Sequence, residues 1–73
     1  MTLASARLGD SYTVSNLGID LDTKRRLGAL GLTRGTKIKL LNRNRSGSVI
    51  VMVRGSRLAL GRKIAESIRL REA

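Results

Sequence analysis

A glycine-rich joint at residues 24–37 constrains the fold of this chain more than any other segment. The joint, KRRLGALGLTRGTK, starts with helical periodicity and ends with the alternation of a strand. Gly31 lies where a left-handed helix C-cap is expected, with Leu32 as the hydrophobic contact beyond it. Gly35 takes the third place of a four-residue turn, where a type II turn requires a positive φ. The joint therefore predicts a helix that ends at a defined point and turns into a strand.

The predicted helix should begin at an aspartate and face the core with one side. Asp20 or Asp22 can cap it, because a short side-chain oxygen accepts hydrogen bonds from the free N–H groups of the first turn. On a helical wheel, Thr23, Leu27 and Leu30 share one side. We expect this side to pack against the core.

Strand patterns recur on both sides of this helix. Residues 11–17 and 36–43 alternate between apolar and polar side chains, as half-buried strands do. Residues 48–54 are apolar on both faces, which favours the most central position in a sheet. Residues 57–60 return after a tight hairpin, in which Gly55 takes the first position of a type II′ turn. A helical turn over 61–67 and a closing strand around 68–70 complete the pattern. The chain is thus expected to be mainly β, a small barrel of about five short strands with a helix inserted after the first strand.

Composition limits the size of the core and the kinds of partner. A chain of 73 residues forms one domain with a small core, and without cysteine it has no disulfide. No apolar run is long enough to span a bilayer, so a cytoplasmic protein is expected. The net charge of +10 favours an acidic partner, which can be a nucleic acid, an anionic membrane face or an acidic protein.

The residue types disfavour catalysis and metal binding. The chain contains no histidine or cysteine, and its five carboxylates are spread along the sequence. Ferrous iron usually requires nitrogen or sulfur ligands or a dense carboxylate set, and no nucleophile–base pair is evident. A phosphate cradle is excluded because the glycines follow a helix and do not precede one. We therefore predict a protein that is not an enzyme, with no catalytic residue, no metal site and no cofactor. Gly31, Gly35 and Gly55 are assigned structural roles in caps and turns.

Three segments of the chain together resemble the FeoA family, the small cytosolic accessory proteins of bacterial ferrous iron transport. They are LGDSYTV, KRRLGALGLTRGTKI and SVIVMVRGSRLALGRKIAESIRL. The resemblance implies an SH3-like domain over residues 8–73, preceded by a loose N-terminal leader of residues 1–7. The domain is also similar to the C-terminal module of metal-dependent repressors of the diphtheria-toxin-repressor type. Arg34 departs from the family pattern, because many relatives have proline there.

The resemblance also implies a function and a partner. The protein is expected to support iron homeostasis as a protein-binding module for FeoB, a GTP-binding ferrous iron transporter of the membrane. A peripheral position at the anionic inner membrane would suit its positive charge. The alternative is a small basic nucleic-acid-binding barrel. That alternative is disfavoured because Tyr12 is the single aromatic side chain that could stack on a base.

One side of the predicted helix is our candidate for the partner-binding site. Lys24 and Arg25 occupy the first turn, where cations mildly oppose the helix dipole and so suggest a role other than stability. Leu21 and Gly28 lie on the same side of the wheel. Together the four residues would form an apolar centre with a basic rim, as protein interfaces do. Two alternatives remain open. The cations, which are scattered along the chain, are also typical of an ordinary solvated surface. Gly28 is also explained by a tolerated substitution in the helix or by a close crossing of another strand.

Overall fold

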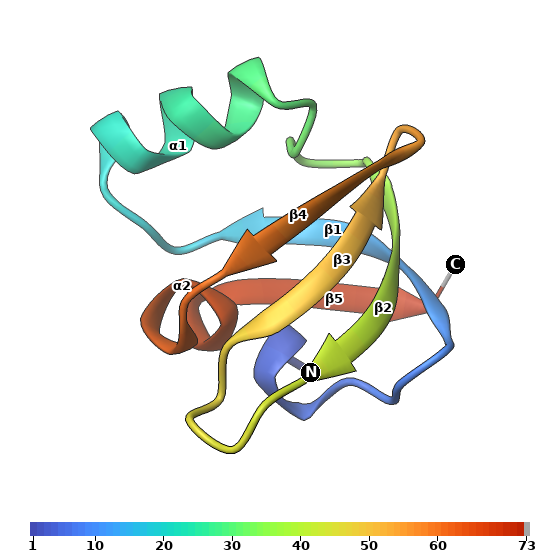
Figure 1. The fold of residues 1–73 in the computed structure, drawn as a ribbon. Coiled ribbons are helices and arrows are strands. Elements are labelled where there is room, and N and C mark those ends of the chain that lie inside the picture. Colours follow the sequence, from blue (N-terminus) through green and yellow to red (C-terminus); the bar gives the residue numbers. More distant parts are fainter. Residues whose placement is uncertain (73) are drawn as a thin grey trace.

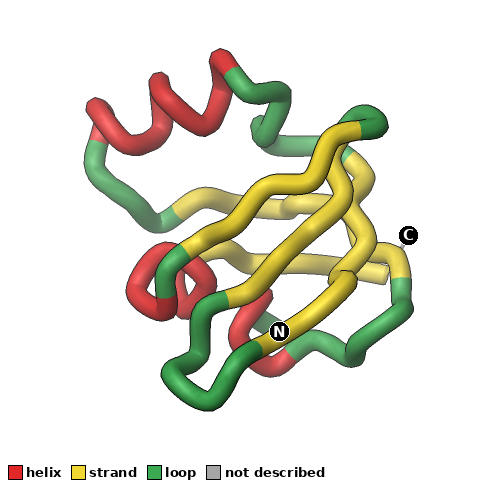
Figure 2. Tube along the Cα trace, in the orientation of Figure 1, coloured by secondary structure: helices red, strands yellow, loops and turns green. Residues whose placement is uncertain are grey.

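Five antiparallel strands form one curled sheet around the core of the protein (Figure 1). The computed structural model describes residues 1–72. Figure 2 shows the sheet at the centre, with α1 well separated from α2 and from the short 3-10 helix η1. In chain order the elements are η1 (Leu3–Ser5), β1 (Ser11–Leu17), α1 (Leu21–Ala29), β2 (Lys37–Arg43), β3 (Val49–Val53), β4 (Ser56–Leu60), α2 (Arg62–Ser67) and β5 (Ile68–Glu72).

The strands are hydrogen-bonded in the order β4-β3-β2-β1-β5. The helix α1 is inserted directly after β1, and α2 connects the two edge strands, β4 and β5. The predicted fold class is therefore confirmed: a mainly β protein with about five short strands and a helix after the first. No helix within residues 1–72 is long and apolar enough to cross a membrane.

The predicted position of β3 is wrong, because β2 and not β3 is central in the sheet. The valines of β3 point into the core, whereas Ile50 is exposed and Met52 is half-buried on the other face. Apolar residues on both faces therefore do not place this strand in the middle. The largest fully buried side chains of the core are Leu3, Val14, Leu32, Leu40, Val49, Val51, Val53 and Ile68.

Residues 1–7 form part of the folded core, so the expectation of a loose leader is wrong. Leu3 is 0% exposed and Ala6 is also buried, and both pack in the same apolar cluster as the strands. Thr2 forms an antiparallel bridge with Arg69 at the edge of β5. This packing could not be predicted from the sequence, because the neighbours of Leu3 are small and residues 1–7 show no strand or helix periodicity.

The joint has the predicted geometry. The N–H of Leu32 donates to the carbonyl of Leu27 (2.9 Å), and the N–H of Gly31 donates to that of Gly28 (3.0 Å). These two bonds, with φ of 93° at Gly31, form a Schellman motif in which the buried residues Leu27 and Leu32 make the hydrophobic contact. Leu30 is 56% exposed, so the prediction that it packs against the core is wrong. The reason is that Leu30 is the C-cap, and the chain turns there so that Leu32 enters the core.

The turn at the second glycine also agrees with the prediction. The N–H of Thr36 donates to the carbonyl of Thr33 (3.1 Å), and φ is 87° at Gly35. No heavy atom lies within 4 Å of a Cβ placed on Gly35. Backbone conformation and not space therefore requires glycine at this position.

The hairpin between β3 and β4 has a different turn from the one predicted. Val53 pairs with Ser56, so the loop consists of Arg54 and Gly55. Both have positive φ, 49° and 81°, which is the pattern of a type I′ turn and not of type II′. Sequence reasoning placed the loop one residue too late. The side chain of Arg54 then reaches back, and its Nε donates to the carbonyl of Gly31 (3.3 Å).

We predict that Leu3→Ala destabilises the protein by about 2–5 kcal/mol, the usual cost of truncating a buried leucine. Leu8→Ala is the matched control, because Leu8 is 54% exposed and its truncation leaves no cavity. Urea unfolding of the two variants measures the difference. Equal stability of the two would mean that the N-terminal segment is not packed.

We also predict that Gly35→Val destabilises strongly, because a β-branched residue is strained at positive φ. Gly35→Asn should retain more of the stability, since asparagine tolerates the left-handed region. Thermal melts of the two variants test the turn. A valine variant that melts like the wild type would contradict the assignment.

Candidate partner-binding site

The helix α1 packs on the rest of the protein through few side chains. Of its nine residues, all of them described, Leu27 is the one that is buried, and Thr23 and Gly28 are half-buried. Figure 1 shows α1 to one side of the sheet, connected through a loop at each end. Most of the helix surface is therefore open to contact.

Asp20, and not Asp22, caps the helix. Its carboxylate accepts the N–H of Thr23 (3.1 Å) through one oxygen and the hydroxyl of Thr23 (2.7 Å) through the other. The Thr23 hydroxyl, and then its N–H, hold the pKa of Asp20 below the ordinary value. The cap is therefore ionised at neutral pH, and it orders the turn from which Lys24 projects.

The four predicted interface residues share one side of α1. Leu21 is 59% exposed, and Lys24 and Arg25 are exposed as well. Gly28 is half-buried, and it lies about two helical turns beyond Leu21. A Cβ on Gly28 would lie 3.6 Å from Cγ2 of Thr33, an ordinary contact distance. A close crossing by another strand is therefore not the reason for this glycine.

Leu30 is an exposed apolar residue of this region that sequence reasoning assigned to the core. By the helical wheel it lies opposite Leu21, so the two do not form a continuous patch. The signal that could have found it is the Gly31-Leu32 pair, because in a Schellman motif the residue after the glycine makes the apolar contact. The α1 region thus exposes leucines at both its ends.

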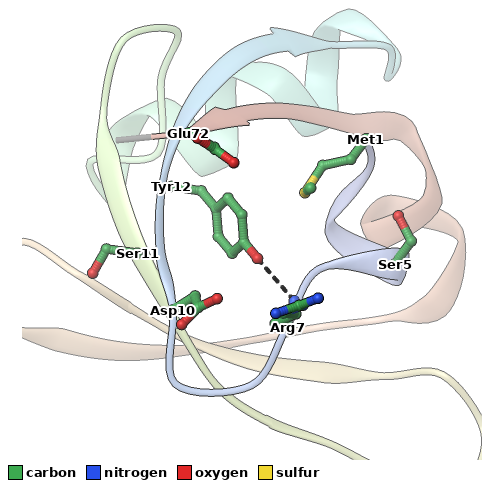
Figure 3. Close-up of a pocket in the computed structure, with 7 residues that line it drawn as sticks. All are labelled: Met1, Ser5, Arg7, Asp10, Ser11, Tyr12 and Glu72. Carbon is green, nitrogen blue, oxygen red and sulfur yellow. Dashed lines mark hydrogen bonds between the residues drawn. The ribbon is translucent and has the colours of Figure 1, made fainter.

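A hollow of about 560 Å³ lies elsewhere, beside the N-terminal segment (Figure 3). The ring of Tyr12 points into it, and the Tyr12 hydroxyl accepts the N–H of Arg7 (3.0 Å). The hydroxyl therefore ties the N-terminal segment to β1. The residues that line the hollow are Met1, Ser5, Arg7, Asp10, Ser11, Tyr12 and Glu72.

The side chains in this hollow do not form a metal centre. The hollow is lined by two carboxylates, Asp10 and Glu72, and by the cation of Arg7 (Figure 3). Within residues 1–72 no group of three or more His, Cys, Asp or Glu side chains is placed to hold a metal ion. The side of α1 that carries Leu21, Lys24, Arg25 and Gly28, called the stripe on α1 below, remains the better candidate for a binding site.

Comparisons with known proteins agree with this architecture. The family model of the FeoA domain matches residues 1–72. A protein of Methanocaldococcus jannaschii, whose name describes it as an Fe(2+) transport protein A, is 34% identical over 71 residues, covering 97% of this chain and 85% of the relative. The solution NMR structure of FeoA from Chlorobium tepidum has a TM-score of 0.88 at 34% identity, covering 96% of this chain and 68% of that one.

A second structural likeness concerns the fold alone. A manganese-dependent transcriptional repressor has a TM-score of 0.89 at 23% identity, over 100% of this chain and 41% of the repressor. This agrees with the expected similarity to a module of metal-dependent repressors. With the family model matching along residues 1–72 and a relative at 34% identity, the chain belongs to the FeoA family.

Proposed function

We propose that this chain is an accessory protein of ferrous iron transport and that it binds a FeoB-type GTP-binding transporter through α1. The family and the name of the Methanocaldococcus relative support the link to Fe(2+) transport. The exposed stripe of α1 is the observation that carries the choice of surface. It combines an apolar residue, a glycine and two cations on a helix that the core holds by few contacts.

A binding role suits these residues better than a chemical one. The carboxylates of this chain do not form a dense set. Asp10 and Glu72 line the hollow, Asp20 and Asp22 lie at the start of α1, and Glu66 lies 3.8 Å from Arg62 on α2. Histidine and cysteine do not occur. The protein therefore acts on transport by contact with a partner and not as an enzyme or as an iron carrier with strong ligands.

The charge of the stripe defines the partner surface. Leu21 and Gly28 provide an apolar centre, and Lys24 and Arg25 provide a basic rim, so the matching surface is apolar at its centre and acidic around it. The same cations suit a position beside an anionic inner membrane, where each contributes about 1 kcal/mol. Tyr12 is 4% exposed and cannot stack on a base, which weakens the nucleic-acid alternative.

We predict that the double variant Lys24→Glu, Arg25→Glu weakens binding to the cytosolic portion of the transporter by about tenfold or more, because two rim charges become repulsive. Its melting temperature should stay within a few degrees of the wild type, since both side chains are exposed. The matched control is Arg45→Glu, Arg71→Glu, which changes the net charge equally at exposed positions outside α1.

Calorimetry at two salt concentrations provides the measurement. Wild-type binding should fall as salt rises, because salt screens the exposed charges. If both double variants bind alike, the contribution of the stripe is only its share of the net charge, and the proposed surface is wrong.

We further predict that Gly28→Ala stabilises the protein by about 1 kcal/mol, since alanine is the better helix former and its Cβ meets Thr33 at an ordinary distance. The same variant should weaken partner binding, because the methyl group covers the bare backbone on the side of the helix that also carries Leu21. Urea unfolding and calorimetry on one sample test both statements. A stabilised variant with unchanged affinity would remove Gly28 from the interface.

A further inference from the structure

The two edges of the sheet are protected differently. Along β5, the N-terminal segment covers the edge: Thr2 bridges Arg69, and the N–H of Leu70 donates to the carbonyl of Met1 (2.9 Å). At the other end of the sheet, β4 pairs with β3 on one side. Among residues 1–72, no strand pairs with its other side, which forms a margin of the sheet in Figure 1.

The hairpin register shows which backbone groups face this free edge. Val53 and Ser56 close a two-residue loop and form a hydrogen-bonded pair, and such pairs alternate along an antiparallel ladder. Arg57 and Ala59 occupy the alternate positions, so their N–H and C=O groups point away from β3. Within the described residues the N–H and C=O groups of Arg57 and Ala59 have no hydrogen-bond partner. Two donors and two acceptors are thus presented with the spacing of a strand ladder.

The side chains along β4 define what could lie beside it. Leu58 is half-buried against the core, so an apolar residue opposite it would complete its burial. Arg57 is exposed on the other face of the sheet. A matching strand would therefore alternate between apolar residues and residues that suit a guanidinium.

The charges around the edge are almost all positive. Exposed Arg54 precedes β4 and exposed Lys63 follows it, while Arg62 lies beside Glu66 on α2. No aspartate or glutamate occurs in the sequence between Asp22 and Glu66. An approaching strand thus meets Arg54 and Arg57 at the hairpin end of β4 and Lys63 beyond its other end.

We propose that the free edge of β4 accepts an extended acidic segment of a partner protein as a sixth strand. Main-chain hydrogen bonds to Arg57 and Ala59 would supply affinity, and the alternating side chains would supply specificity. A second copy of this chain fits poorly, because each copy carries a net charge of +10 and edge pairing would bring their arginines together. This edge is separate from the stripe on α1, and the inference does not depend on which protein is the transport partner.

The test uses the full chain and a synthetic nine-residue peptide of alternating valine and glutamate. We expect NMR shifts and slowed amide exchange at Arg57 and Ala59 when the peptide is added. The same peptide with lysine in place of glutamate should not bind. Equal binding of the two peptides, or a failure of the glutamate peptide to bind, would overturn the proposal.

Ala59→Pro is the decisive variant. Proline removes one outward N–H and no bond of the β3–β4 ladder, and edge strands tolerate it on that side. Peptide affinity should fall by about tenfold or more. A second measurement does not depend on the folding of a variant. The binding of peptides N-methylated on alternate residues to the wild-type protein is compared with that of the unmethylated peptide. Methyl groups on the side facing β4 should abolish binding, and those on the other side should not. Unchanged affinity in either comparison, or shifts confined to α1, would contradict strand addition.

Discussion

The hydrogen bond from the N–H of Leu32 to the carbonyl of Leu27 determines how the helix α1 is joined to the sheet. It closes α1, turns the chain at Gly31 and brings Leu27 and Leu32 into contact within the core. From there the turn at Gly35 aligns β2 beside β1. The Arg54 side chain adds a hydrogen bond from the β3–β4 hairpin to the carbonyl of Gly31, at the end of α1. The exposed stripe of α1 therefore has a fixed direction although few side chains of the helix are buried.

The distribution of charge organises the surfaces of the protein. The acidic residues lie at the start of α1, beside Tyr12 and on α2. Every charged residue between Asp22 and Glu66 is a lysine or an arginine. That segment includes most of α1 and all of β2, β3 and β4. Both proposed surfaces, the stripe on α1 and the free edge of β4, would thus favour acidic partners. Their apolar parts, Leu21 and Leu58, differ in shape: one projects from a helix and the other lies along a strand.

Much of the fold could be predicted because local chemistry and global packing agree. The bounds of β1 followed from alternation, and the end of α1 followed from Gly31 and Leu32. Leu30 could not be placed by a helical wheel, since its burial depends on where the helix stops. The turn type at Gly55 depended on a register one residue different from the one assumed. The candidate stripe on α1 was accessible from periodicity, whereas the free edge of β4 required the strand order, which no local pattern contains.

The pairing of Thr2 with Arg69 has a kinetic meaning. These residues stand near opposite ends of the described chain, and β1 likewise pairs with β5 across most of it. Such contacts must close a long loop before they contribute, and topologies rich in them fold slowly compared with helical proteins. The hairpin of β3 and β4 and the turn at Gly35 are local and can form early. We therefore expect the two chain ends to pair late in folding, when Leu3 enters the core.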